Sequence, residues 1–421
     1  MLTAARLCAA ALTVAVFTAT ATPAFAAATA SPSTGASAAP LPAGLYGRTD
    51  PTYDAVFRQG LSLLALRAEQ VTPAASAVSW LTGQQCADGG WEAYRVDPAR
   101  ACTPSQENTN STSMAVQALV AVGGEQAAVS KAVGWYQKIQ NSDGGWPYSP
   151  ATASDAGSTA LVDSALAAAR TAPATVVKDG RNGVQALDAF QLGCSAPAAQ
   201  QGGFAYQPNK AGKLVANDAA SAEAALAVTG GFLPVAAPSG TPTVDPATSC
   251  SNAKEAAAQY LAKRLSTGDG HISVAEAGST SAAPDYSSTA WAALSLADAG
   301  WSAPAAGAVQ WLRENGEAWI QGQNGVPLSS ALALLILDAK ATGLDPHAFG
   351  TTDLVAQLIS IGPAPAAVPS AAVSTAAVAA TAAATSGGKG ISPWWVFGVV
   401  LIAAIGGGLL FSYNRAKGKR A

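Results

Sequence analysis

Apolar residues recur every three or four positions through most of the middle of the chain, and polar segments rich in glycine and proline separate these runs. This spacing predicts α-helices, since strands alternate with a period of two. One set of runs is so rich in Ala, Leu and Ser that we expect its helices to be buried on most sides. These inner helices are predicted near residues 54–68, 109–122, 157–170, 218–229, 287–299 and 328–341. Outer helices are predicted between them, near residues 73–85, 125–140, 180–193, 252–265, 304–315 and 351–360.

A repeated turn joins the helices. A glutamine followed by Asp-Gly-Gly-Trp occurs within residues 80–94 and again within residues 135–148, and weaker copies end at Phe204, His271 and Trp319. The glycines supply the positive φ angles that end a helix, and the aspartate can bond nearby backbone amides. Six such hairpins suit a closed, two-layered α/α ring. An open solenoid is the alternative, but it should show polar capping repeats, and none is visible.

An Asp or Asn followed by Ser or Thr precedes four of the inner helices, at residues 108–113, 155–160, 217–222 and 285–290. These residue types favour the N-cap of a helix. We expect them on one rim of the ring together with the aromatic residues of the turns. The candidate ligand-binding residues on that rim are Asn108, Asp155, Asp218, Asp285, Tyr286, Trp91, Trp146, Tyr148, Phe204, Tyr206 and His271. In such positions Asp and Asn are more often caps, and aromatics more often buried plugs, than ligand contacts.

The first residues are typical of a secretory signal. Arg6 precedes an apolar run, and Ala24-Phe25-Ala26 offers small residues where a signal peptidase cuts, so residues 1–26 are predicted to be a signal peptide. An Ala-rich core helix is the alternative. Residues 27–43 have the composition of a disordered segment.

The last residues predict an anchor. Residues 363–392 are almost entirely Ala, Pro, Val, Ser, Thr and Gly, which indicates a flexible stalk. Residues 393–413 are long and apolar enough to span a bilayer, and the basic tail at 414–421 predicts that the upstream residues face outside. The sequence therefore predicts a folded part at 44–362 outside the cell, held at the membrane by a single span.

Charge and cysteine content limit the possible partners and indicate disulfide bonds. Charged residues are 12% of the chain, the formal net charge is −3, and no basic stripe suggests nucleic acid. Four cysteines follow the predicted signal, and an even number outside the cell indicates two disulfides. Three pairings are possible; we favour Cys86–Cys102 and Cys194–Cys250, because each pair brackets one expected loop region. A zinc site is a weaker alternative, because no CxxC spacing is present and the chain has two histidines.

The spacings Gln85-x3-Gly89-x-Trp91 and Gln140-x3-Gly144-x-Trp146 resemble the QW motif of the prenyltransferase and squalene-cyclase repeat family. The resemblance covers most of residues 50–345 and implies an all-α fold, an α/α toroid with a central cavity. The family includes terpene cyclases, protein prenyltransferases, complement-type thioester domains, and the cobalamin carriers transcobalamin and intrinsic factor. Since one fold serves many functions, the site residues must decide between them.

The catalytic residues of the enzymes in this family are not found. Residues 285–290 match the cyclase motif Asp-x-Asp-Asp-Thr-Ala, but Ser287 and Ser288 replace the second and third carboxylates, and a hydroxyl cannot protonate an alkene. A prenyltransferase zinc site cannot be assembled, and residues 123–126 lack the thioester cysteine. A polysaccharide lyase or glycosidase stays open, with Asp155, Asp218, Asp285, Tyr286 and His271 as its candidate residues.

We therefore expect a non-catalytic binder. Its resemblance to the cobalamin carriers implies capture of cobalamin or another bulky nutrient for uptake by a membrane transporter. The carriers add a β-rich domain after the toroid, where this chain has a stalk and an anchor, so a second surface protein could complete the site. A terpene-cyclase-like or polysaccharide-lyase-like enzyme with an unrecognised site is the alternative, and an adhesive surface protein is a third possibility. A carboxylate pair at the cavity would favour an enzyme, and an aromatic mouth without acids would favour a binder.

Overall fold

The computed structural model describes residues 41–237, 249–275, 282–322 and 325–369, which belong to one compact unit beginning at Leu41. The predicted signal peptide, membrane span and basic tail lie outside the described residues, as does most of the predicted stalk. Among the described residues, no helix is both long and apolar enough to cross a membrane.

Both predicted sets of helices are present, with bounds within a few residues of those expected. The inner helices are α1 Ala55–Ala68, α3 Thr109–Val122, α5 Ala156–Ala168, α7 Asp218–Thr229, α9 Tyr286–Asp298 and α12 Ser329–Thr342. The outer helices are α2 Ala75–Gly83, α4 Gln126–Ile139, α6 Gly183–Phe190, α8 Ala253–Thr267, α10 Ser302–Asn315 and α13 Leu354–Ser360.

The described residues also form smaller elements that the sequence did not predict. A short helix, α11 Glu317–Gln321, follows α10, and two 3-10 turns lie at Pro173–Thr175 and Pro346–Ala348. Two antiparallel hairpins pair β1 Val177–Lys178 with β2 Arg181–Asn182, and β3 Ser273–Ala275 with β4 Ala282–Pro284.

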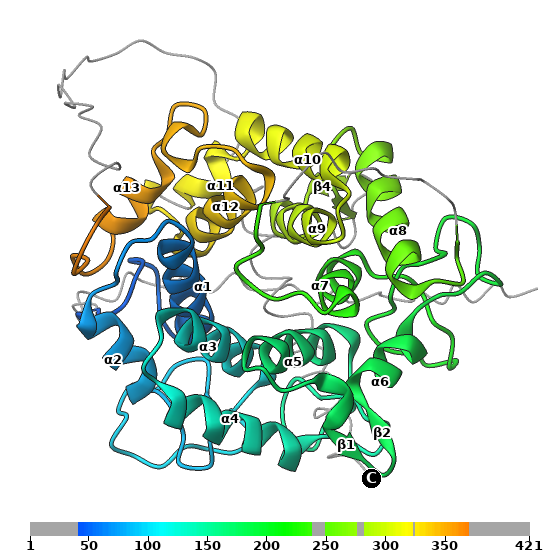
Figure 1. The fold of residues 1–421 in the computed structure, drawn as a ribbon, viewed down its shortest axis with the longest axis horizontal. Coiled ribbons are helices and arrows are strands. Elements are labelled where there is room, and N and C mark those ends of the chain that lie inside the picture. The colour runs from blue at the N-terminus through cyan, green and yellow to red at the C-terminus, as the bar shows by residue number, and fades with distance from the viewer. Residues whose placement is uncertain (1–40, 238–248, 276–281, 323–324, 370–421) are drawn as a thin grey trace, which may run out of the picture. The chain divides into compact units, whose positions relative to one another are not determined.

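The six inner helices close into a ring (Figure 1). Each packs against the next along the chain, in the order α1, α3, α5, α7, α9 and α12, and α12 packs back against α1. Every outer helix packs on the inner helix beside it in the chain, which gives the second layer. An open solenoid would lack the contact between α12 and α1, so the closed ring is the correct alternative.

Small residues let the inner helices approach closely. Gly60 of α1 lies against α3, where an added Cβ would stand 2.8 Å from the carbonyl oxygen of Met114. Real Cβ contacts are longer than this, so a side chain at position 60 would push the two helices apart. Small residues on the facing sides of these helices are therefore a packing requirement.

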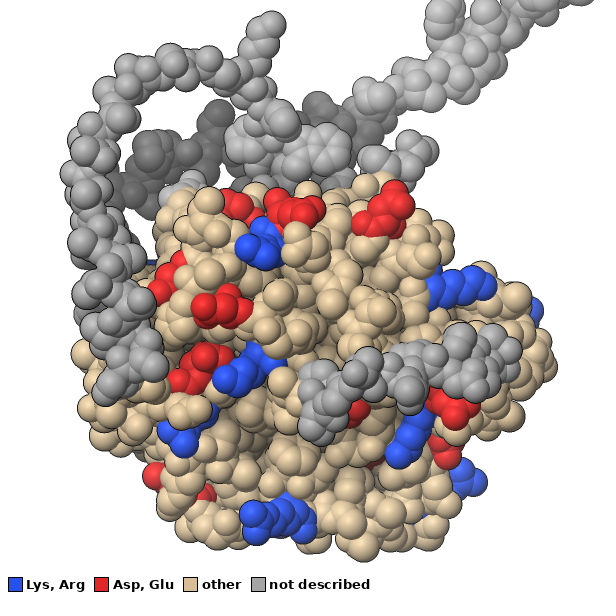
Figure 2. All heavy atoms as spheres, turned by 45° about the horizontal axis from the view of Figure 1, so that its top comes forward, with Lys and Arg blue, Asp and Glu red and all other residues tan. Residues whose placement is uncertain are grey.

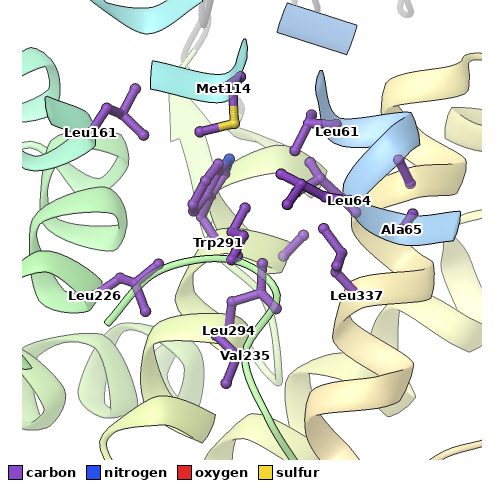
Figure 3. Close-up of a cluster of buried hydrophobic side chains, with 14 of the residues drawn as sticks. Leu61, Leu64, Ala65, Met114, Leu161, Leu226, Val235, Trp291, Leu294 and Leu337 are labelled. Carbon is purple, nitrogen blue, oxygen red and sulfur yellow. The ribbon is translucent and has the colours of Figure 1, made fainter. Parts of the chain in front are cut away.

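Apolar side chains fill the interior of the ring (Figure 3). Met114 of α3 and Trp291 of α9 meet there with leucines of α1, α7 and α12, and each of these side chains is almost fully buried. The segment after α7 adds Val235, and it is held by a hydrogen bond from the Leu233 N–H to Oε1 of Gln117, 2.8 Å long. Along this stretch the central cavity implied by the family resemblance is replaced by packed core.

Two disulfides join the favoured pairs, Cys86–Cys102 and Cys194–Cys250. All four cysteines that follow the predicted signal are thereby used, which leaves no thiolate for the alternative zinc site. Charged side chains are scattered over the face shown in Figure 2, and no basic stripe crosses the part of it that the structure describes.

Candidate functional site

The turns place the starts of successive inner helices side by side on one rim. The N–H of Thr109, at the start of α3, donates to the carbonyl oxygen of Tyr148 in the next turn, at 3.0 Å. The N–H of Ala156, at the start of α5, donates in the same way to Tyr206, also at 3.0 Å. Tyr148 and Tyr206 each stand two residues after a turn aromatic, so the repeat itself builds this rim.

The expected rim acids and amides act as helix caps. The side chains of Asn108, Asp155, Asn217 and Asp285 accept hydrogen bonds from backbone N–H groups three residues later, at 2.7–2.9 Å. A cap of this kind contributes about 1 kcal/mol, which explains why Asp or Asn stands at all four places. In the third of these helices the cap is Asn217, so the carboxylate of its neighbour Asp218 is free for another role.

The turn aromatics are buried plugs. Trp91, Trp146 and Phe204 expose none of their surface. Their backbone N–H groups donate to the hydroxyls of Thr112, Thr159 and Ser221 at 2.8–3.0 Å, and the two indole N–H groups donate to carbonyls of the preceding outer helices. None of the three has exposed surface with which to contact a ligand. They are therefore buried plugs of the turns and not the ligand-binding residues expected from the sequence.

The fourth and fifth turns have a different register from the one expected. The Ile272 N–H donates to the Thr289 hydroxyl at 3.0 Å, as Trp146 does to Thr159, and Ile272 is buried. In the fifth turn the carbonyl oxygen of Ile320 accepts a hydrogen bond from the N–H of Leu328, the residue before α12. In the other turns the carbonyl oxygen of the buried plug residue accepts the equivalent bond, as that of Trp146 does from Asp155. Ile272 and Ile320 are therefore the plugs, and each aromatic expected there, His271 and Trp319, lies one residue earlier.

Polar residues lie about one helical turn before the apolar residues that fill the axis, and we call this group the mouth. Met114, Leu161, Leu226 and Trp291 belong to the central cluster of Figure 3. Residues three or four positions earlier share the same helix face, so the mouth consists of Asn110, Gly157, Glu223 and Ser287. Asn110, Glu223 and Ser287 are partly exposed, whereas the leucines and Trp291 beneath them are buried.

Asp155 and Glu223 form an acidic pair at this mouth. A Cβ built on Gly157 would lie 2.5 Å from Oε2 of Glu223 and 3.6 Å from Oδ1 of Asp155, so Gly157 lies against both residues and its missing side chain makes room for the Glu223 carboxyl. Oδ1 of Asp155 caps α5, while its buried Oδ2 has no hydrogen-bond partner among the described residues.

Both carboxyls of the acidic pair hold protons more tightly than usual. Burial, followed by the charge of Asp155, raises the pKa of Glu223 to about 8. Burial raises the pKa of Asp155 to about 6, against the lowering effect of hydrogen bonds from Ser158. Near neutral pH Glu223 therefore keeps its proton, whereas Asp155 is mostly ionised.

Two tyrosines and an amide complete this side of the mouth. Burial raises the pKa of Tyr148 and of Tyr206, and the charge of Asp155 adds to both shifts, so both phenols stay neutral. Oδ1 of Asn110 accepts from the Ser158 hydroxyl at 3.4 Å, which ties α3 to α5 at the rim. Hydrogen-bond donors and acceptors therefore lie close together on this side of the mouth.

Asp218 is held in an ion pair. Its carboxylate accepts from Arg264 at 2.7 and 2.9 Å and from the Tyr260 hydroxyl at 2.6 Å. The hydrogen bond to Asp218 raises the pKa of Arg264, which keeps the guanidinium charged. With three donors on one carboxylate, Asp218 joins α7 to α8 and is less available to a ligand than Glu223.

Four rings form an aromatic cluster beside the start of α9. His271 stacks on Trp311 with ring centroids 4.1 Å apart, and Tyr286 stacks on Trp319 at 5.7 Å and lies 5.5 Å from Trp311. His271, Tyr286 and Trp311 are partly exposed. Burial lowers the pKa of His271, so its ring is neutral at physiological pH.

Sequence reasoning missed Glu223 and Trp311. Glu223 is the one acid inside the Ala-rich α7 after its first turn, and it stands three residues before Leu226 on the inward face. An acidic residue on the apolar face of an inner helix is unusual, so the sequence did indicate a functional position here. Trp311 lies on an outer helix, where a single aromatic gives no such signal.

Comparisons with known proteins give only weak matches. No protein-family model matches the chain, and no curated protein matches it significantly. Among solved structures, the chain is similar to a substituted form of a glycosidase (16% identity, TM-score 0.44) and to "Glycosidase Wild Type" (16% identity, TM-score 0.42). Each comparison covers 72% of this chain and 92% of the other. The description of the fold therefore rests on the contacts within this chain.

Proposed function

We propose that this chain is a cell-surface toroid of the prenyltransferase and squalene-cyclase repeat type that binds a bulky small molecule at its mouth, with cobalamin as the first ligand to test. The observation that carries the proposal is the arrangement of partly exposed polar and aromatic side chains above a filled axis. Ligand sites commonly combine apolar surface with a few convergent polar groups.

The filled axis favours binding at the rim over catalysis inside the ring. A terpene cyclase must enclose an apolar chain, yet Trp291 and Met114 occupy the axis where that chain would lie. Ser287 and Ser288 also stand where the cyclase motif has carboxylates. A ligand at the mouth would lie on this core, not within it.

The chemistry of the mouth suits a large ligand with amide groups and a flat face. Asn110 and the carboxyls of Asp155 and Glu223 accept hydrogen bonds from N–H donors, and a protonated Glu223 can also donate one. Tyr286 and Trp311 are partly exposed and offer apolar contact area beside the start of α9. Corrinoids carry amide side chains around a flat macrocycle and so match both features.

A ligand that lies on the filled axis would have one side uncovered by this chain. The predicted signal peptide, stalk and membrane span would hold the ring outside the cell. A second surface protein or a membrane transporter would then cover the exposed side of the ligand.

The acidic pair favours a second candidate function, a glycosidase or polysaccharide lyase. Such enzymes use two neighbouring carboxyls with different proton affinities, and burial gives Asp155 and Glu223 pKa values of about 6 and about 8. In this candidate Glu223 is the general acid and Asp155 the base. Its cap hydrogen bond would hold Asp155 in place.

Calorimetric titration of the purified chain with cobalamin and with cobinamide tests the first proposal. Saturable one-to-one heat with either corrinoid is expected. An absence of heat with both contradicts binding by this chain unaided. Glu223→Gln separates the two candidate functions: loss of glycan turnover would establish the enzyme, whereas corrinoid binding without turnover by the native chain would establish the binder.

A further inference from the structure

The first and second turns differ at the residue before the cap. In the second turn this residue is Ser154, and its hydroxyl donates to Oδ1 of Asp143 at 2.8 Å. In the first turn Glu107 stands before the cap Asn108, and Asp88 takes the place of Asp143. A carboxyl therefore faces a carboxyl where the second turn has a neutral donor and an acceptor.

Glu107 is buried without a partner for its charge. It is 1% exposed, and within the part of the chain that the structure describes its Oε2 has no hydrogen-bond partner. A carboxyl oxygen of Glu107 lies within 4.8 Å of both a carboxyl oxygen of Asp88 and Sγ of Cys86. Glu92 adds a third carboxyl beside the Cys86–Cys102 disulfide. No ion pair among the described residues includes any of these acids.

A buried carboxylate of this kind requires either a proton or a cation. A carboxyl oxygen of Glu107 lies within 4.8 Å of a carboxyl oxygen of Asp88, so two carboxyls converge here and one cation can neutralise both. The disulfide sulfurs are not thiolates and offer little to a metal ion, which leaves the carboxyl oxygens as ligands. Oxygen donors suit a hard cation that accepts several water ligands.

We propose that Asp88 and Glu107 hold a Ca²⁺ ion at the first turn. Glu107 supplies the buried ligand, the exposed Asp88 supplies the outer one, and Glu92 adds negative charge from the same loop. The remaining positions go to water on the side of Asp88. With two carboxylate ligands, an affinity in the range of about 10⁻⁴–10⁻³ M, typical of extracellular modules, is expected. The ion ties the disulfide loop to the start of α3.

Tb³⁺ luminescence of the purified full chain tests this site, because the nearby Trp135 can transfer excitation energy to a bound Tb³⁺ ion. Its Nε1 lies 2.8 Å from the point where a Cβ on Gly90 would stand, and Oε2 of Glu107 crowds the same point. Excitation of tryptophan should give Tb³⁺ emission that saturates and that Ca²⁺ displaces. An absence of sensitised emission from the native chain overturns the proposal.

Matched variants localise the signal. Glu107→Ser copies the second turn, so it should fold, as circular dichroism can verify, and should lose the emission together with any rise in Tm on adding Ca²⁺. Asp88→Asn should weaken Tb³⁺ binding at least tenfold. Asp143→Asn, the same change in the second turn, should leave it unaltered. Emission that persists in both Glu107→Ser and Asp88→Asn places the ion elsewhere and refutes the assignment.

Discussion

The first and second turns of the ring share one framework. In each, the glutamine side chain, Gln85 or Gln140, donates both to a carbonyl of its own turn and to one in the segment that follows the next inner helix, at 2.8–3.1 Å. In each, the first glycine has a positive φ and packs against backbone. The tryptophan is buried in both and bonded to a threonine of the inner helix. We call this set of contacts the turn framework.

The two turns differ at two positions that are not part of the turn framework. The residue before the cap is Glu107 in one and Ser154 in the other, and the cap itself is Asn108 in one and Asp155 in the other. The first difference creates a cluster of carboxyls beside a disulfide, and the second places a charge next to Glu223. Repeated residues therefore carry the fold, and chemical specificity lies in the positions that vary between repeats.

Removing a framework residue should have the largest effect. Trp146→Ala deletes a fully buried indole and its hydrogen bond to Tyr136, so we expect the free energy of unfolding to fall by about 3–5 kcal/mol. Chemical denaturation followed by circular dichroism measures this change. Trp91→Ala should cost a similar amount. A loss below about 1 kcal/mol in either variant would mean that the turns are not plugged as described.

Converting the second turn into the first should have the next largest effect. Ser154→Glu places a buried carboxyl opposite Asp143 and removes the hydrogen bond between them, so at neutral pH we expect a loss of about 1–3 kcal/mol. Ca²⁺ should recover part of that loss in the variant. If Ser154→Glu is as stable as the native chain, the two turns do not differ in the way proposed.

The acidic pair should make stability depend on pH. The pKa of Glu223 is raised from 4.5 to about 8 in the folded chain, so the folded state binds more protons than the unfolded state between these values. Stability is therefore greatest below pH 4.5 for this group and falls as pH rises towards 8. Glu223→Gln should remove this contribution and flatten the dependence of Tm on pH.

A matched control sharpens the pH experiment. Glu314→Gln changes an exposed acid on α10, and Tm should depend on pH in this variant as it does in the native chain. Since Glu107 adds a similar slope, Glu223→Gln should reduce the native dependence without abolishing it. Equal dependence of Tm on pH in the native chain and in Glu223→Gln would show that the pKa of Glu223 is not raised in the folded chain.

Exchanging one cap for the other should have the smallest effect. Asp155→Asn copies Asn108, and the amide oxygen can accept the Ser158 N–H, so we expect stability to change by no more than about 0.5 kcal/mol. Asp155→Ala should cost about 1 kcal/mol because the cap is lost. Equal losses in the two variants, measured by thermal unfolding, would contradict the cap as the structural role of Asp155.

The sequence predicted the helices and turns because each is encoded locally, and the number of repeated hairpins suggested the ring. Apolar spacing marked α1 to α13 apart from the short α11, and the glycines and caps marked the turns. It placed the plugs of the fourth and fifth turns one residue early, because Ile272 and Ile320 lack the aromatic signal used to align the repeats. The acidic pair was missed because Asp155 and Glu223 lie far apart in the sequence and meet only when α5 packs against α7.

The central claim is that the ligand-binding function lies at the mouth and not in the turn framework. The most direct test is the affinity for cobalamin, by calorimetric titration, of the native chain and of the mouth double variant Asn110→Ala, Glu223→Gln. The account predicts saturable binding by the native chain and at least a tenfold weaker affinity in the folded double variant. Equal affinities in the two proteins would place the ligand elsewhere and contradict the account.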